Sequence, residues 1–143
     1  MSKKSQNNRI MIVDDDPNML KLMQFYLLED DYNIISFTKG LDALAILKKE
    51  QFDIVLIDIL MPEMDGHTLL KKIREELKLE IPVVIVTAHG PNDNLMNMID
   101  AGAYDILQKP FTKNRLKLTL RNALRHKTLT DKCNELAAKL SQD

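Results

Sequence analysis

Aspartates follow two separate apolar runs, which is where a divalent cation could bind. The run Asp14–Asp16 comes directly after IMIV, and Asp58 comes directly after DIVLI. Two carboxylates about 4 Å apart repel each other by roughly 4 kcal/mol at an effective dielectric constant of 20, so a cluster of them needs a cation. Oxygen ligands without nearby His or Cys favour a hard cation, Mg²⁺ or Mn²⁺. The carboxylates therefore predict such a metal site.

Two further polar residues extend this chemistry. Thr87 ends the apolar run VVIV, and Lys109 comes directly after the run YDILQ. A carboxylate could act as a nucleophile toward phosphorus and form an aspartyl phosphate. A lysine would balance the charge of the transferred phosphoryl group, and a hydroxyl would donate a hydrogen bond to it. The residue types thus favour phosphoryl transfer to a carboxylate.

Alternating strands and helices must bring these residues together. Short apolar runs predict strands, and apolar residues at helical spacing predict helices. The expected strands are 9–14, 32–37, 53–58, 82–88 and 104–108. The expected helices are 17–29, 40–50, 67–78, 92–101 and one that begins at Thr112. This order predicts an α/β fold, a doubly wound (βα)5 unit with a five-stranded parallel sheet and an extended C-terminal helix.

A parallel sheet of this kind gathers the polar residues at one edge. Crossovers between parallel strands are right-handed, so the carboxyl ends of all five strands lie on the same side. Ligands of such sheets bind beyond that edge, where the strand order reverses. Strands also end simply where polarity begins, but that would explain one or two of these residues and not the set.

Composition restricts the classes of function. The chain has 143 residues, 45% of them hydrophobic, and a net charge of −1. These values predict one compact domain and indicate neither a nucleic-acid nor a membrane partner. Cys133 is the single cysteine, which excludes a disulfide within the chain. The polar start MSKKSQNNR is not a signal peptide, so we expect a cytoplasmic protein with a flexible segment over residues 1–8.

Four motifs in this order resemble the receiver domain of two-component response regulators, the CheY-like domains. They are VDDD, LIDILMPEMDG, VTA and KPF, at the ends of the first, third, fourth and fifth expected strands. Each is common alone, but all four in register make a specific match over about residues 8–125. The resemblance implies a flavodoxin-like strand order 2-1-3-4-5 and a receiver domain over 9–126. It implies no enzyme activity beyond the domain's own phosphorylation and dephosphorylation.

The resemblance assigns the phosphoacceptor and the metal ligands. Asp58 would take a phosphoryl group from a sensor histidine kinase, a phosphotransfer protein or a small phosphodonor. Asp15 would bind Mg²⁺ directly, and Asp14 would bind it through water. Asp58 and the backbone carbonyl of Leu60 would complete the protein ligands.

The resemblance also implies how the phosphoryl group is sensed. Lys109 would contact Asp58 and then the phosphoryl group, Thr87 would move its hydroxyl toward that group, and the bond from Lys109 to Pro110 would be cis. The surface of helix 92–101, strand 104–108 and the last helix would then switch and control an output domain or a downstream protein. A homodimer through that surface or through the C-terminal helix belongs to the same expectation.

Two positions depart from the usual receiver pattern. Many receivers have an aromatic residue three positions before the lysine, and its rotamer follows the threonine; here that residue is Ile106. Strand alternation predicts Tyr104 on the same face as Ile106, where it could substitute, although ordinary packing is the favoured role.

The second departure concerns the water that hydrolyses the phosphoryl group. The two side chains expected to flank it are Leu60 and His89. Leu60 has no hydrogen-bonding group with which to orient water, which predicts slow autodephosphorylation. For His89, an active role and an inert, exposed position are weighed equally.

Local signals assign the remaining polar residues. Asp16 precedes Pro17, and proline suits the first position of a helix, so Asp16 is interpreted as a helix N-cap and not as a metal ligand. Asp65 is interpreted as the N-cap of the helix over 67–78. Gly66 is expected to adopt a turn conformation closed to other residues.

The C-terminal helix carries two apolar stripes. Leu116, Leu120 and Leu124 suit a helix that covers the sheet, and a heptad seam 4, 3 and 4 residues apart follows them: Leu129, Cys133, Leu136 and Leu140. Residues 127–143 therefore predict either a helical linker to an output domain or a coiled coil. We favour a linker helix of a longer regulator that can associate with a second copy.

Two other classes of function compete with a phosphorylated receiver. A degenerate receiver would bind proteins without phosphorylation, but Asp14, Asp15, Asp58, Thr87 and Lys109 are all present. A flavin binder or a dehalogenase-type phosphatase could share the fold. The acidic run argues against a flavin phosphate site, and Leu60 stands where the dehalogenase pattern has a second aspartate.

Overall fold

Strands and helices alternate along the chain as the hydrophobic pattern predicts. The structure, a computed structural model, describes residues 8–88 and 93–141. The strands are β1 (Arg9–Val13), β2 (Asn33–Phe37), β3 (Ile54–Asp58), β4 (Val83–Thr87) and β5 (Asp105–Gln108). The helices are α1 (Pro17–Tyr26), α2 (Gly40–Leu47), α3 (Gly66–Lys71), the π-helical turn η2 (Lys72–Glu76), α4 (Asp93–Asp100) and α5 (Lys113–Ser141).

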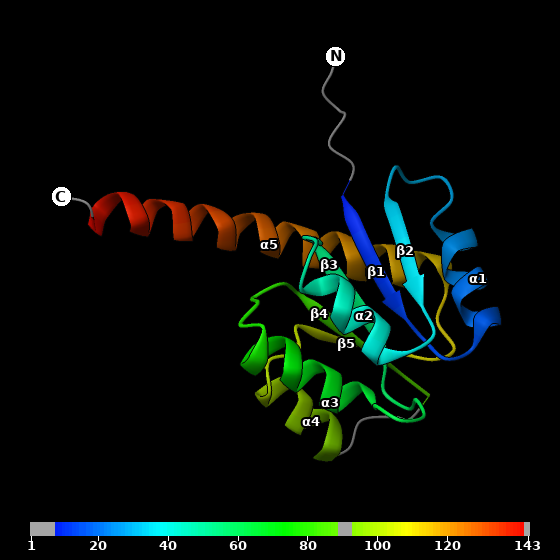
Figure 1. Cartoon of the computed structure of the whole chain (residues 1–143). Coiled ribbons are helices and arrows are strands. Elements are labelled where there is room, and N and C mark those ends of the chain that lie inside the picture. Colours follow the sequence, from blue (N-terminus) through cyan, green and yellow to red (C-terminus); the bar gives the residue numbers. More distant parts are fainter. Residues whose placement is uncertain (1–7, 89–92, 142–143) are drawn as a thin grey trace.

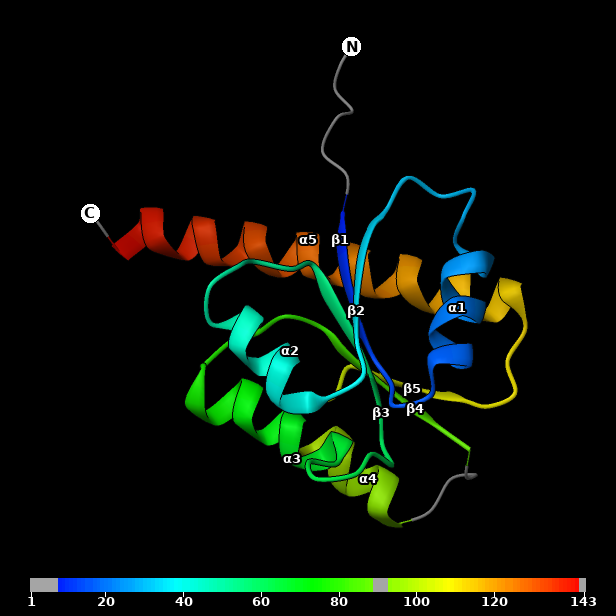
Figure 2. The same cartoon turned by 45° about the vertical axis from the view of Figure 1, so that its right-hand side comes forward.

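All five strands are parallel and lie in the order β2-β1-β3-β4-β5, which confirms the expected fold and strand order. Helices α2, α3 and α4 cover one face of the sheet, and α1 and α5 cover the other (Figure 1). Figure 2 shows the same two layers from a second direction. No helix of the described residues is long and apolar enough to span a membrane.

The central strands have apolar side chains on both faces because helices cover both sides of the sheet. Alternate residues of β1 belong to opposite core clusters: Met11 packs with the α2–α3 side and Ile12 with the α1–α5 side. Within β3 and β4, every residue is buried. A sheet held this firmly fixes the positions of the polar residues that follow its strands.

Several helices end earlier than the apolar periodicity indicated. The pattern predicted a regular helix over 67–78. The observed helix changes from α to π geometry after Lys71, where the Leu77 amide donates a hydrogen bond to the Lys72 carbonyl oxygen. The guanidinium of Arg74 lies in this turn and donates to the carbonyl oxygens of Gly102 and Leu79. Apolar periodicity does not report these contacts, because the acceptors lie outside the helix.

The C-terminal helix is one continuous element. It runs from Lys113 to Ser141 with no break at the expected boundary between residues 126 and 127. Leu116 and Leu120 are fully buried against the sheet, as the first apolar stripe predicted, and Leu124 packs beside them. The division of the chain at that boundary therefore stays a prediction about function, because the backbone does not mark it.

Candidate functional site

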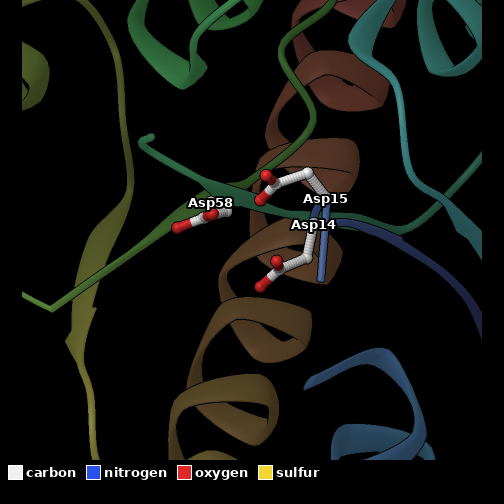
Figure 3. A group of neighbouring side chains, drawn as sticks. All are labelled: Asp14, Asp15 and Asp58. Carbon is white, nitrogen blue, oxygen red and sulfur yellow. The ribbon is translucent and has the colours of Figure 1, made fainter. Parts of the chain in front are cut away.

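Carboxylates from two adjacent strands meet at the carboxyl edge of the sheet. β1 pairs with β3 so that Val13 lies opposite Ile57, and the next residues are Asp14 and Asp58. Asp14 is fully buried, Asp58 is 7% exposed, and Asp15 is exposed. Each contributes one carboxylate oxygen to a group in which all oxygens lie within 4.8 Å of one another (Figure 3). The sheet thus brings together the three expected metal-site aspartates.

Lys109 supplies the positive charge in this group. Its Nζ lies 3.2 Å from Asp14 Oδ2 and 3.5 Å from Asp58 Oδ1. Asp14 is therefore the closer partner, although the family pattern pointed to Asp58. The bond between Lys109 and Pro110 is cis, as expected.

Burial and neighbouring charges shift the acidity of Asp58. The pKa of its carboxyl is raised to about 6, first by the loss of hydration on burial and then by the negative charge of Asp14. The ammonium of Lys109 acts in the opposite direction on this pKa, and Asp15 adds a smaller upward effect. The half-buried Lys109 supplies one positive charge against three clustered carboxylates, which is the electrostatic setting expected of a cation site.

Thr87 ends β4 beside this cluster. Its side chain is buried, and its carbonyl oxygen accepts a hydrogen bond from the Lys109 amide at 2.6 Å. In the sheet, Thr87 lies opposite Gln108, the residue before the lysine. The backbone therefore links the hydroxyl-bearing residue and the ammonium-bearing residue across two neighbouring strand ends.

Asp16 caps α1, as predicted, and its carboxylate is not part of the group formed by Asp14, Asp15 and Asp58. Its Oδ1 accepts a hydrogen bond from the Asn18 amide at 2.9 Å and caps α1. Its own amide donates to Asp14 Oδ1, also at 2.9 Å. The sequence reasoning missed this second bond, although an aspartate often accepts from the amide two residues later. The bond fixes the buried carboxylate of Asp14.

Position 66, in the loop after β3, requires glycine for a different reason than the sequence suggested. Gly66 was expected to adopt a conformation closed to other residues, but among the described glycines only Gly102 has a positive φ. A Cβ on Gly66 would instead lie 2.6 Å from the Asp58 carbonyl oxygen and 2.8 Å from Ile59 Cα. Glycine is needed for close approach of two backbones. Asp65 does cap α3, accepting from the Thr68 amide at 2.8 Å.

The residues expected to tune the site lie in three different settings. Leu60 is 60% exposed in the loop that follows Asp58. Ile106 packs with the α2–α3 side of the core. His89, the second residue expected near the attacking water, lies outside the described residues.

The expectation that Tyr104 shares a face with Ile106 is wrong. Tyr104 packs with the α1–α5 side of the core, and its ring lies 4.9 Å from that of His126. Alternation fails because Tyr104 precedes β5 and follows the turn at Gly102, which has φ +113°. Its contact with α5 agrees with the packing role that the sequence favoured.

Comparisons with known proteins agree with this geometry. A family model described as the response regulator receiver domain matches residues 10–121. The transcriptional regulatory protein ZraR of Salmonella typhimurium is 40% identical over 117 residues, which cover 82% of this chain and 26% of ZraR. The two-component response regulator ORR24 of Oryza sativa subsp. japonica is 36% identical over 121 residues, which cover 83% of this chain and 19% of ORR24.

A solved structure with the same fold is NtrX from Brucella abortus. It aligns with a TM-score of 0.84 and 28% identity, over 92% of this chain and 30% of NtrX. The chain therefore spans about a quarter of the length of ZraR and about a fifth of the length of ORR24.

The close approach at Gly66 gives a testable prediction. Gly66→Ala should lower the free energy of unfolding by about 1–3 kcal/mol, because the new Cβ meets backbone atoms that cannot rotate away. It should also weaken Mg²⁺ binding, since Asp58 must shift. Urea unfolding and a Mg²⁺ titration measure both effects.

The matched control is Gly40→Ala, whose Cβ would meet the flexible side chain of Met64 at 3.1 Å. Equal losses in both variants would contradict the argument.

The pKa of Asp58 gives a second prediction, for Mg²⁺-free buffer. Because its folded-state pKa of about 6 lies above 3.8, the native protein binds this proton more tightly than the unfolded chain does. The resulting stability is complete below pH 4 and is lost as the pH rises to about 6.

Asp58→Asn removes the ionisable carboxyl, so the variant does not lose stability as the pH rises. Its free energy of unfolding at pH 7.5 should exceed that of wild type by up to about 3 kcal/mol. The advantage should shrink toward pH 4. Urea unfolding across this pH range measures the difference, and Asp31→Asn, at an exposed loop position, is the control. An advantage that does not change with pH would rule out the shifted pKa as its cause.

Proposed function

The chain belongs to the receiver domain family of response regulators, and we propose that it is a Mg²⁺-dependent phosphoacceptor whose nucleophile is Asp58. The observation that carries this proposal is the grouping of three carboxylates with one lysine. Asp14, Asp15 and Asp58 bring oxygens within 4.8 Å of one another, and Lys109 Nζ lies against two of these side chains. A purely structural ion pair would need one carboxylate and not three.

The donor set fits Mg²⁺. The carboxylates of Asp14, Asp15 and Asp58 and the backbone carbonyl of Leu60 would hold the ion, directly or through water, and all of these donors are hard oxygen ligands. When bound, the ion would neutralise carboxylate repulsion and orient the oxygens of an incoming phosphoryl group. Mn²⁺ would satisfy the same donors.

The protein side chains have defined tasks in the transfer. A carboxylate oxygen of Asp58 attacks phosphorus, a new P–O bond forms, and the P–N bond to the histidine of a kinase or phosphotransfer protein breaks. The ammonium of Lys109 moves from the carboxylates to the oxygens of the phosphoryl group. The hydroxyl of Thr87 then donates a hydrogen bond to that group.

The consequence of phosphorylation would be read on the α4–β5–α5 surface. Met96 and Ile99 are exposed on α4, so this helix offers apolar side chains that a partner or an output domain can contact. The relatives ZraR and ORR24 are several times longer than this chain, which supports a role as the input module of a regulator. The partners would then be a histidine kinase upstream and an output domain or protein downstream.

Phosphorylation by acetyl phosphate and Mg²⁺, followed by intact mass measurement, tests the proposal. Wild type should gain one phosphoryl group, and Asp58→Asn should gain none because its amide is not a nucleophile. Asp15→Ala should lose the Mg²⁺-dependent adduct. Asp16→Ser should keep it, because serine is also a good N-cap and the substitution leaves the backbone amide that donates to Asp14 in place.

A folded wild-type protein that gains no phosphoryl group would contradict this function and favour the degenerate, phosphorylation-independent binding module. An adduct that persists in Asp58→Asn would place the nucleophile elsewhere. Circular dichroism of each variant shows whether it is folded.

The apolar side chain at Leu60 leads us to expect a long-lived aspartyl phosphate at Asp58. The side chain is exposed beside the acceptor but has no group that can orient the attacking water. Leu60→Asn should therefore shorten the lifetime of the aspartyl phosphate, by about tenfold or more for a well-placed amide. Loss of the phosphorylated mass over time, after removal of acetyl phosphate, measures the rate. Leu60→Met keeps an apolar side chain and should leave the lifetime unchanged. Identical lifetimes in all three proteins would exclude this role.

A further inference from the structure

The last part of α5 extends beyond the sheet that its first part covers. Leu116, Leu120 and Ala123 are fully buried, whereas every described side chain from Asp131 to Leu140 is exposed. Figure 1 shows this part of the helix, in orange and red, continuing past the strands toward the C-terminus. A helix with no core to cover is stable in water only if another surface packs on it or its own propensity suffices.

One side of this extension faces the domain, and its contacts there are polar. Lys127 Nζ lies 3.8 Å from Asp53 Oδ1, and Asn134 Nδ2 lies 3.5 Å from Glu80 Oε1. A groove of about 650 Å³ lies between the helix and the loops before β3 and β4, and Thr130 and Asp131 line it. These contacts orient the helix without burying its apolar residues.

The heptad seam points the other way. Leu129, Leu136 and Leu140 are 58%, 60% and 74% exposed, and Cys133 between them is also exposed. At 3.6 residues per turn, the centre of the seam lies about 140° around the helix from the side that faces the groove. The apolar seam therefore cannot be covered by its own domain in the arrangement that the polar contacts fix.

We propose that a second copy of this chain covers the seam, as a parallel, in-register pair of α5 helices. The spacing of 4, 3 and 4 residues assigns Cys133 and Leu140 to a positions and Leu129 and Leu136 to d positions of a two-stranded coiled coil. Because each domain lies on the far side of its helix, two helices can meet along the seam without contact between the domains at that point.

The charges that flank the seam select the parallel orientation. The g positions are all basic, Arg125, Lys132 and Lys139, and the e positions are Thr130 and Ala137. In an antiparallel pair, g residues face g residues, so the two basic rows would repel each other. In a parallel pair, g residues face e residues, so the lysines lie beside uncharged neighbours and their alkyl stems can cover the seam.

The parallel arrangement places identical residues opposite each other. Cys133 of one copy would lie across the axis from Cys133 of the other, between layers of paired leucines. The seam is shorter than the roughly three to four heptads of a confident coiled coil, so the dimer should be weak and concentration-dependent. This dimer does not depend on phosphoryl transfer, so it can be tested in unphosphorylated protein.

Cross-linking of the full chain with a short bismaleimide tests the proposal, since Cys133 is the only cysteine. A covalent dimer should form, its yield should rise with protein concentration, and sedimentation equilibrium should show the same trend. Leu136→Asp should abolish both signals. Leu41→Asp, at an equally exposed leucine on α2, should leave both unchanged.

Moving the cysteine tests the face and the orientation. In a Cys133→Ser background, Leu140→Cys should still cross-link, because a parallel pair places position 140 opposite itself. In the same background, Glu135→Cys lies off the seam and should not cross-link. Cross-linking at position 133 but not at 140 would overturn the parallel arrangement.

A protein that stays monomeric at all concentrations would overturn the proposal and leave the seam to a different protein or domain. A dimer that forms without cross-linking at Cys133 would also overturn it, because the copies would then meet through another surface.

Discussion

The structure depends on repulsion between carboxylates that the sheet forces together. Asp14 and Asp58 follow adjacent buried strands, so neither can move away from the other without disturbing the core. Lys109 lies against both, yet the pKa of Asp58 is raised to about 6, mainly because the carboxyl is buried. Three clustered carboxylates share this one ammonium, so the site carries an excess of negative charge that a divalent cation would relieve.

The surrounding backbone holds the imbalance in place. Asp16 caps α1 and donates its amide to Asp14, so the start of the helix fixes a buried carboxylate. Gly66 lets the loop after β3 pass within contact distance of the Asp58 backbone. These features lie outside the carboxylates and the lysine but position the backbone that carries them.

The helix α5 has two surfaces with different tasks. Its first turns complete the core beside β5, and Tyr104 packs against it there. From Lys127 onward the helix makes polar contacts with Asp53 and Glu80 of its own domain and exposes an apolar seam. Because the helix is continuous, a displacement at the sheet can reach the seam without a hinge. The proposed pairing of two seams would thus connect the core of each domain to the dimer.

The amino-acid sequence was sufficient to predict the strands, the parallel sheet and the meeting of Asp14, Asp15 and Asp58 at one edge, because short apolar runs that alternate with helical patterns and end in polar residues are typical of buried parallel strands. Tertiary structure decided what depends on neighbours distant in sequence. It placed Lys109 closer to Asp14 than to Asp58, and it placed Tyr104 on the opposite face from the one predicted. Patterns along a chain report periodicity and polarity, whereas distances between side chains arise only when separate elements pack together.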